Sequence, residues 1–444
     1  MTTQIFQAST LYGTATLAAA LDSGCFRPAD RRILLVCNNA ATPETTPGLD
    51  VMPGFERLRD RFDDVLSYNE AIFPFHPGGW APRPDDLPLW ERYLRHEWRL
   101  GDDDVELAVE SIQVNPSLAL AQMFTGAPVT VYADGLMSYG PTRNKIDPLV
   151  GTRVDRVLHL DLVPGLEPLL LTEFGVPGEI VPTPAFTKVL AELAPLGDGL
   201  PEAEEPALLL GQYLSALDIL TAEQEEDLHV RMLKGAVRLG HRRVVFKPHP
   251  TAPARFTRTL EQEAEKLGVD LTVLDTPVLA EVLYQRMRPA LVVGCFSTAL
   301  LTASALYGLP VARVGTDLLL ERLTPFENSN RIPVTVVDAL LPELGDEAAV
   351  TAQRRGTDVE ALGALVRAVG FAMQPKILPG LRVESERYLA AHLDQRTLRY
   401  FKRKRLTSLA LPGGVPAQLS FIPRNATVRR MARKARGLRR VVRR

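Results

Sequence analysis

The chain has 444 residues, with 51 Lys and Arg, 53 Asp and Glu, and a formal net charge of −2. Its composition, 46% hydrophobic and 23% charged, is that of an ordinary soluble globular protein. At roughly 100–200 residues per domain, this length predicts two or three domains.

Three cysteines, Cys25, Cys37 and Cys295, form neither a disulfide framework nor a zinc pattern, which favours a reducing cytoplasm. The sequence has no run of about 18 apolar residues, so we expect no membrane-spanning helix. The first ten residues, MTTQIFQAST, lack the basic, apolar and cleavage regions of a signal peptide.

The small net charge conceals a strong asymmetry along the chain. Residues 396–444 hold 16 Lys and Arg and no Asp or Glu, so the other 395 residues carry 35 basic and 53 acidic side chains. A body of charge −18 therefore ends in a segment of charge +16. Such a segment favours an anionic partner, either a membrane surface or a nucleic acid.

Short apolar runs alternate with longer amphipathic runs, which predicts an α/β fold with parallel sheets. In the first half of the chain we expect strand 4–7, helix 11–22, strand 32–37, helix 87–100, strand 105–111, helix 117–124, strand 128–132 and strand 156–160. In the second half we expect strand 207–210, helix 221–239, strand 243–247, helix 254–267, strand 270–274, helix 278–286, strand 291–293, helix 298–306 and strand 310–314.

The stretch PLGDGLPEAEEP at residues 195–206 breaks this alternation and is typical of a linker. It predicts an N-terminal Rossmann-like domain over 1–194, a C-terminal Rossmann-like domain over 207–375, and C-terminal helices with a basic tail over 376–444. Two such domains facing a central cleft form the GT-B arrangement of glycosyltransferases. Periodicity alone leaves other two-domain α/β enzymes open.

Candidate site residues follow the expected strands, because ligands of open α/β sheets bind at the carboxyl ends of strands. After strand 243–247, His249 stands between Pro248 and Pro250, which fix its backbone, and close to Lys247. A rigid imidazole beside an ammonium group suits a phosphate, to which it can donate a hydrogen bond or a proton. A surface turn whose prolines only end the strand fits equally well.

Two further junctions carry polar groups. Ser297 and Thr298 begin an expected helix, where free N–H groups and the helix dipole bind anions, although both residues are also common helix caps. Asp134 and Gly135 follow strand 128–132, where a carboxylate can accept the proton of an attacking hydroxyl. An isolated Asp-Gly is more often a plain turn.

The first strand–helix junction adds two small hydroxyl residues. Ser9 and Thr10 are candidates for substrate binding, with helix capping slightly favoured. No DxD pair stands at a strand end to hold a nucleotide diphosphate through a divalent ion, so we expect no metal and no cofactor.

These motifs, in this order, resemble those of the bacterial α-2,8-polysialyltransferase family, which is similar to the lipooligosaccharide sialyltransferases. Those families have a D/E-D-G motif in the N-terminal domain, and a His-Pro motif and a Ser-Ser or Ser-Thr pair in the C-terminal domain. His249-Pro250 and Ser297-Thr298 match, while Tyr132-Ala133-Asp134-Gly135 matches in part. The opening FQASTLYGTATLAAALDSG is also similar to that of actinobacterial members.

The resemblance implies a GT-B fold and inverting, metal-independent transfer of a nonulosonic acid, such as sialic acid, from a CMP-activated donor to a glycan or lipid-linked acceptor. It implies that Asp134 deprotonates the acceptor hydroxyl. It also implies that His249 stabilises or protonates the departing CMP phosphate, which Ser297 and Thr298 hold.

The donor side of the expected site takes in further residues. Lys247, Pro250 and Gly135 are assigned there with the motifs to which they belong. Glu281, in PVLAEVL, is a candidate contact for the ribose, with an exposed helix glutamate as the more common alternative.

One departure from the family pattern leaves alternatives open. Ala133 stands where the first acid of D/E-D-G belongs, so the protein either uses Asp134 from a shifted backbone or lacks the usual base. A transferase of the teichoic-acid type, using a CDP-alcohol such as CDP-glycerol, also has His-Pro motifs at the donor phosphate. A non-catalytic nucleotide- or nucleic-acid-binding protein is the third alternative.

The basic tail carries a helical pattern. Val428, Met431, Ala435, Leu438 and Val442 are spaced as one narrow apolar stripe, with Arg and Lys around the rest. Such a helix can lie on an anionic membrane, and the upstream segment 400–405, YFKRKR, adds interfacial aromatics and a second basic cluster. We therefore expect a cytoplasmic protein docked on the inner membrane face. A disordered tail is the alternative, and nucleic acid is disfavoured because the body is acidic.

Overall fold

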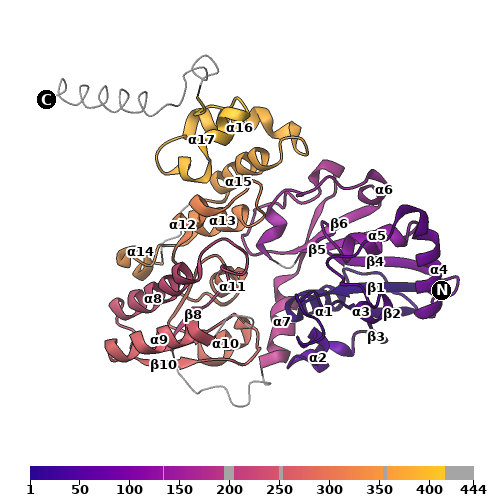
Figure 1. The fold of residues 1–444 in the computed structure, drawn as a ribbon, viewed down its shortest axis with the longest axis horizontal. Coiled ribbons are helices and arrows are strands. Elements are labelled where there is room, and N and C mark those ends of the chain that lie inside the picture. Colours follow the sequence, from indigo (N-terminus) through magenta and orange to yellow (C-terminus); the bar gives the residue numbers. More distant parts are fainter. Residues whose placement is uncertain (134, 195–204, 250–253, 354–357, 416–444) are drawn as a thin grey trace.

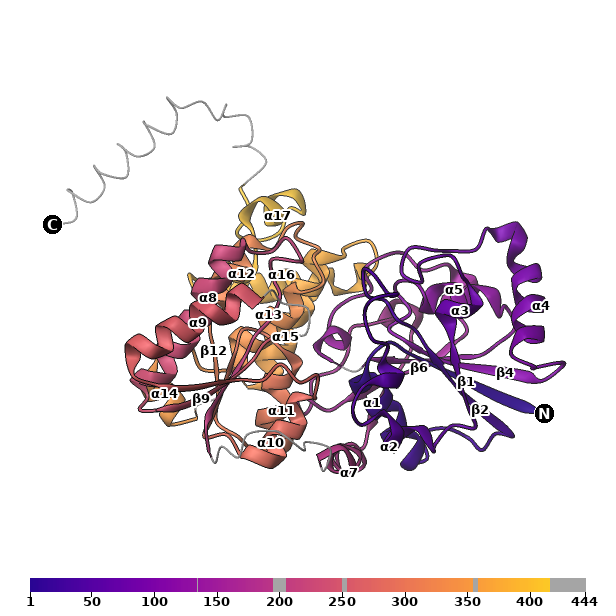
Figure 2. The same cartoon turned by 60° about the horizontal axis from the view of Figure 1, so that its bottom comes forward.

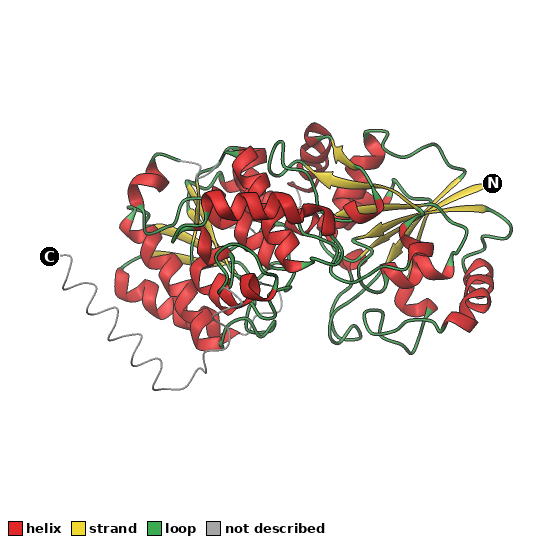
Figure 3. Cartoon of the chain, turned by 90° about the horizontal axis from the view of Figure 1, so that it is seen from above, coloured by secondary structure: helices red, strands yellow, loops and turns green. Residues whose placement is uncertain are grey.

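The structure is a computed structural model, and it describes residues 1–133, 135–194, 205–249, 254–353 and 358–415. Two parallel β-sheets lie side by side, each covered by helices (Figures 1 and 3). Asp134, Pro250, most of the expected linker and the expected tail helix lie outside the described residues.

The first sheet has seven parallel strands in the order β3-β2-β1-β4-β5-β6-β7. Their bounds are β1 Thr2–Ala8, β2 Arg31–Val36, β3 Asp64–Ser67, β4 Asp104–Glu110, β5 Val129–Ala133, β6 Val154–Leu160 and β7 Gly178–Val181. The strand order reverses between β1 and β4, which is the position where Rossmann-like sheets bind ligands.

The second sheet has five parallel strands in the order β10-β9-β8-β11-β12. Their bounds are β8 Ala207–Leu210, β9 Arg243–Lys247, β10 Asp270–Val273, β11 Leu291–Gly294 and β12 Val311–Arg313. This is again the Rossmann order, with the reversal between β8 and β11.

Helices pack on both sheets, as Figure 2 shows from a second direction. Those of the first domain are α1 Leu11–Asp22, α2 Phe55–Arg59, α3 Tyr68–Ala71, α4 Leu87–Glu97, α5 Ser117–Met123, α6 Pro148–Gly151 and α7 Thr183–Leu193. Those that follow are α8 Ala222–Arg238, α9 Ala254–Leu267, α10 Ala280–Met287, α11 Thr298–Tyr307, α12 Thr316–Arg322, α13 Arg331–Leu340, α14 Glu347–Thr351, α15 Val359–Met373, α16 Arg382–His392 and α17 Arg403–Ser408.

Strong apolar patterns gave the correct elements. The ten expected strands lie within two residues of observed strands at either end, and α1 and α9 have the expected bounds. Two strands were missed: β3 and β7, which form the two edges of the first sheet. Both are only partly buried, so neither shows the two-sided apolar pattern of a central parallel strand.

Apolar packing joins the two domains. One buried cluster lies on the α4–α5 face of the first sheet. The other covers the α1–α7 face and continues without a break into the core of the second domain. The chain also returns to the first domain after the second sheet, where the Gln374 Nε2 atom donates to the Arg143 carbonyl at 2.7 Å. The relative placement of the domains therefore rests on a shared core.

The segment from Tyr400 to Arg405 belongs to that folded body. The side chains of Tyr400 and Phe401 are buried, and the Tyr400 hydroxyl donates to Asp338 Oδ2 at 2.7 Å. The Arg405 guanidinium forms an ion pair with Glu327 at 2.7 Å. The prediction that this segment supplies interfacial aromatics is therefore wrong. Arg403 and Lys404 are exposed, and the role of a second basic cluster stays a prediction. In the described ranges, no helix has the length and apolar character needed to cross a membrane.

Replacing Phe401 by Ala should lower the free energy of unfolding by about 3–5 kcal/mol, because it opens a cavity at a buried aromatic position. The exposed neighbour Arg403 is the matched control, and Arg403→Ala should change it by less than about 0.5 kcal/mol. Denaturant unfolding of both variants measures the difference. Similar small losses in both would mean that the segment does not pack on the body.

Candidate active site

The two sheets meet at the carboxyl ends of β5 and β11. A Cβ atom on Gly135, just after β5, would lie 2.7 Å from Thr298 Oγ1, at the start of α11. The next backbone amide, of Leu136, donates to the same Thr298 hydroxyl at 3.4 Å, a long hydrogen bond. Gly135 has an extended backbone, so this position needs glycine for space and not for conformation. The acidic-motif turn and the Ser-Thr pair are thus brought together across the domain boundary.

Ser297 and Thr298 occupy the helix start that the sequence predicted. Ser297 is the N-cap of α11, and its Oγ atom accepts a hydrogen bond from the Ala299 amide at 3.2 Å. Thr298 is the first helical residue, and its hydroxyl contacts the first domain. Both side chains are half-buried at the N-terminal end of a ten-residue helix, where partial positive charge gathers. Anion binding here stays a prediction.

His249 lies beside a pocket of about 460 Å³ at the carboxyl end of β9. Desolvation is the main cause that lowers the pKa of His249, and the positive charge of Lys247 lowers it further. The negative charge of Glu225 opposes this shift. Burial lowers the pKa of Lys247 as well, against the opposing charge of Glu281. The imidazole is therefore biased toward its neutral form, which can both donate and accept a hydrogen bond.

Neighbouring strand ends connect His249 with the start of α11. The rings of His249 and Tyr213 are 6.4 Å apart between centroids. The adjacent Gln212 accepts a hydrogen bond from the Phe296 amide at 3.2 Å through its Oε1 atom. Because β9, β8 and β11 are consecutive in the sheet, these contacts place the His-Pro and Ser-Thr motifs close together at the carboxyl ends of these strands.

Glu281 is not an exposed helix residue. Its side chain is 3% exposed, and its carboxylate accepts a hydrogen bond from Thr302 Oγ1 at 2.6 Å. Burial raises the pKa of Glu281, and the Thr302 hydrogen bond and the charge of Lys247 oppose that shift. The alternative of an exposed glutamate is therefore wrong. A contact between Glu281 and a ribose stays a prediction.

The switch point of the first sheet holds a carboxylate that the sequence reasoning missed. The backbone amide and hydroxyl of Ser9 both donate to Glu110 Oε2, at 3.1 and 2.5 Å. Thr10 caps α1 by accepting a hydrogen bond from the Gly13 amide at 2.9 Å, as the capping interpretation expected. The available signal for Glu110 was an acid at the end of an apolar strand, the position from which the other candidates were drawn.

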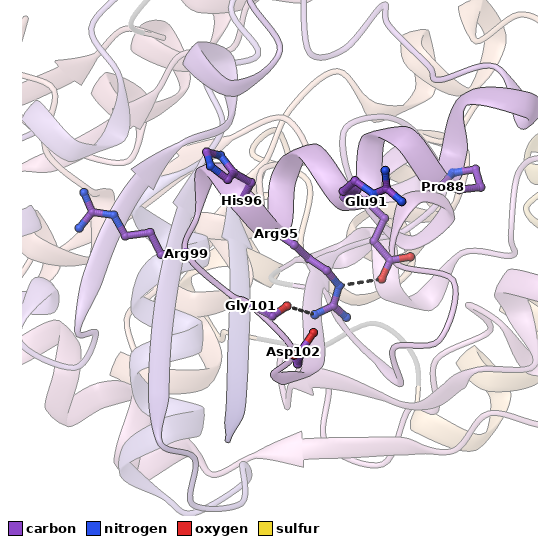
Figure 4. A pocket seen from close by; sticks show the side chains of 8 residues that line it. Pro88, Glu91, Arg95, His96, Arg99, Gly101 and Asp102 are labelled. Carbon is purple, nitrogen blue, oxygen red and sulfur yellow. Dashed lines mark hydrogen bonds and ion pairs between the residues drawn. The ribbon is translucent and has the colours of Figure 1, made fainter.

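Another pocket lies at the opposite end of the strands of the first sheet. It has a volume of about 730 Å³ and is lined by α4 and by the turn that precedes β4 (Figure 4). The guanidinium of Arg95 is occupied there, donating to Glu91 at 3.0 Å and to the Gly101 carbonyl at 3.2 Å. This pocket is at the amino ends of the strands, away from the motifs described above.

A family comparison decides the broad identity of this arrangement. The model of the alpha-2,8-polysialyltransferase family matches residues 4–316. The chain belongs to this family. It is therefore a sialyl-transferring glycosyltransferase, which confirms the resemblance drawn from the motifs. Two Rossmann-order domains that meet at their strand ends, in a member of this family, also confirm the predicted GT-B-like fold.

Solved structures with detectable likeness have low sequence identity. A sialyltransferase from Photobacterium damselae is 12% identical, covering 75% of this chain and 95% of its own, with a TM-score of 0.39. MurG from Acinetobacter baumannii is 11% identical, covering 87% and 95%, with a TM-score of 0.39. A UDP-GlcNAc 2-epimerase from Methanocaldococcus jannaschii is 12% identical, covering 84% and 100%, with a TM-score of 0.45. No curated protein sequence matches the chain.

The contact between Gly135 and Thr298 can be tested by a double-mutant cycle. Gly135→Ala alone should lower the free energy of unfolding by about 1–3 kcal/mol, because the new methyl group overlaps the Thr298 hydroxyl. In a Thr298→Ala background the same change should cost clearly less, since the hydroxyl is absent. Thermal unfolding of the four proteins measures this coupling. An equal loss in both backgrounds would contradict the contact.

Proposed function

We propose that this family member transfers a nonulosonic acid from a CMP-activated donor to a hydroxyl group of a glycan or lipid-linked acceptor. The reaction inverts the anomeric centre and needs neither a metal nor a cofactor. The observation that carries the proposal is the contact of the Gly135 turn with Thr298, which brings the acidic motif next to the N-terminus of α11.

The donor phosphate would lie between the start of α11 and the end of β9. The hydroxyl groups of Ser297 and Thr298 would supply hydrogen-bond donors, and the start of α11 and Lys247 would supply positive charge. A CMP leaving group carries one phosphate, so these groups can stabilise its developing charge in place of a metal ion. Neutral His249 would donate a hydrogen bond to the phosphate oxygen as the bond to the sugar breaks.

The acceptor side supplies the base. The acceptor oxygen attacks the anomeric carbon while the bond from that carbon to the CMP oxygen breaks. The acceptor proton passes to a carboxylate, for which we propose Asp134. This assignment takes Asp134 as the acid of the partial D/E-D-G motif, since Ala133 has no ionisable group. Pro250 would restrict the backbone of His249, and Ser9 and Thr10 would lie on the acceptor side.

Replacing His249 by Ala should lower kcat/KM by about 10²–10⁴-fold, because the leaving phosphate loses its donor. His241→Ala, at the opposite end of β9, is the matched control and should keep nearly full activity. CMP release from CMP-sialic acid measures the rate, and EDTA should not change it.

A thermal-shift screen separates the donor classes, because a ligand that binds the folded state raises its stability. CMP should raise the melting temperature more than CDP-glycerol. Full activity of His249→Ala, or no CMP release by the unmodified enzyme with any CMP-nonulosonate, would overturn the proposal.

We also propose that the enzyme acts in the biosynthesis of a capsule or other cell-surface polysaccharide, docked on the cytoplasmic face of the membrane. Residues 424–444 hold ten Lys and Arg and no acid, in a chain whose body is acidic. Each basic residue near an anionic surface contributes about 1 kcal/mol. Since the segment around Tyr400 is folded into the body, the membrane contact is assigned to residues 424–444.

Removing residues 424–444 should abolish binding to vesicles that contain phosphatidylglycerol while leaving the CMP-induced thermal shift intact. Vesicle co-sedimentation at rising salt measures the first effect, and neutral phosphatidylcholine vesicles are the control, because the attraction is electrostatic. Retained vesicle binding after the deletion would contradict this docking. Salt-sensitive binding to duplex DNA without vesicle binding would do the same.

A further inference from the structure

A pocket of about 900 Å³ opens at the carboxyl ends of β2 and β3, in the first domain. It lies at the same end of the strands as Ser9. The strand β2 adjoins β1, and just after β2 the Cys37 amide donates to the Ala8 carbonyl at 2.9 Å. No residue of the donor site lines it. It lies in the first domain, the proposed acceptor domain, at the carboxyl ends of the strands, where open α/β sheets bind ligands, and this position suits the sugar that receives the transferred group.

The floor of this pocket is built from two asparagines. The Asn38 amide donates to Asn69 Oδ1 at 2.8 Å, and Asn69 Nδ2 donates back to the Asn38 carbonyl at 2.9 Å. The Asn38 side chain then donates to the carbonyl of Thr46 at 2.8 Å. These bonds hold the loop after β2 against the start of α3, so the pocket is formed before any ligand binds.

His76 ties the two loops of the pocket together. Its Nδ1 atom accepts a hydrogen bond from the Gly78 amide at 3.2 Å, so the proton of a neutral ring must be on Nε2. Nε2 then donates to the Ala40 carbonyl at 2.8 Å. The rim therefore has a fixed shape, and His76 takes part in it through both ring nitrogens.

Exposed aromatic side chains line one wall. Phe73 is 81% exposed and Phe75 is 49% exposed, which is unusual for large apolar groups clustered in one pocket. Phe75 stacks on Trp80, with ring centroids 5.7 Å apart and an interplanar angle of 16°, so its orientation is supported from behind. An aromatic face of this kind suits the C–H face of a sugar ring.

The charge of the pocket has one sign. Glu44, Asp50 and Glu70 line it, all three are exposed, and its lining contains no Lys or Arg. Across the described ranges, no ion pair neutralises any of the three. Carboxylates accept hydrogen bonds from sugar hydroxyls but repel the carboxylate that every sialic acid unit carries.

We propose that the acceptor bound here is an uncharged glycan and not a growing polysialic acid chain. This inference rests on the proposed function, in that it names the acceptor class of that same reaction. Aromatic stacking and carboxylate acceptors favour a neutral sugar ring, and three unpaired negative charges disfavour a polyanion. The enzyme would thus add a nonulosonic acid to a neutral chain end, after which its own product is a poor acceptor.

Direct binding to the full chain tests the acceptor class without any donor. The probes are neutral oligosaccharides ending in glucose, galactose, mannose, N-acetylglucosamine or N-acetylgalactosamine, and an α-2,8-linked sialic acid trimer as the anionic probe. We expect saturation-transfer NMR to detect at least one neutral probe, with the trimer binding at least about ten-fold more weakly. Tighter binding of the trimer, or no binding by any neutral probe, overturns the proposal.

Two variants assign the binding to this pocket. Phe75→Ala should weaken binding of the neutral probe by about ten-fold or more. Leu149 is an exposed apolar residue elsewhere, and Leu149→Ala should leave this binding unchanged. The triple variant Glu44→Gln, Asp50→Asn, Glu70→Gln should bind the trimer more tightly at low salt, because the repulsion is gone. An unchanged neutral affinity in Phe75→Ala, or unchanged trimer affinity in the triple variant, contradicts the assignment.

The donor and acceptor proposals fail separately. CMP release with no neutral-glycan binding would overturn only the acceptor class. Neutral-glycan binding that depends on Phe75, without any CMP-induced thermal shift, would overturn only the donor.

Discussion

The close approach of Gly135 and Thr298 is the constraint on which the site depends. A phosphate held by the start of α11 is useful to the reaction only if an acid of the first domain is near it, and these two residues adjoin at the domain boundary. The shared apolar core and the returning C-terminal helices maintain that approach. A side chain at position 135 would push the end of β5 away from the start of α11. The site therefore requires the absence of a Cβ atom there as well as its polar groups.

A local sequence pattern predicts the strands, helices and site residues whose placement depends on neighbouring residues in the chain. β8 and β11 are apolar on both faces and α1 has a clear cap, so each was found at nearly its true bounds, whereas the partly exposed edge strand β3 carries little pattern of its own. His249 and Ser297 were predicted because they directly follow such strands. Glu110 was missed because its partner, Ser9, is 101 residues away in the sequence. Tyr400 was misassigned because charge and aromatic content do not reveal the buried Asp338 that its hydroxyl reaches.

Electrostatics divides the molecule into regions of different tasks. Residues 1–395 carry a net charge of −18, and the pocket at β2 and β3 concentrates carboxylates in the proposed acceptor domain. On the donor side, Lys247 and the start of α11 offer a local positive region within this negative field. In the proposed reaction, an anionic donor would be attracted to this region, while an anionic acceptor would be repelled from the pocket at β2 and β3. The proposed neutral acceptor would mean single transfer to a chain end and not polymerisation, whereas the family model is named for polysialyl transfer.

The missing acid at Ala133 raises the question of whether Glu110 replaces it. Glu110 is opposite Tyr132 in the register of β4 and β5, so it lies close to the acidic motif. Its Oε2 atom, however, accepts two hydrogen bonds from Ser9, and the two residues that follow it, Ser111 and Ile112, both have positive φ angles. A carboxylate committed to holding the β1–α1 turn at a strained strand end is suited to positioning that turn, and less suited to receiving a proton from a substrate. The geometry thus assigns Glu110 a positioning role and leaves Asp134 as the proposed base.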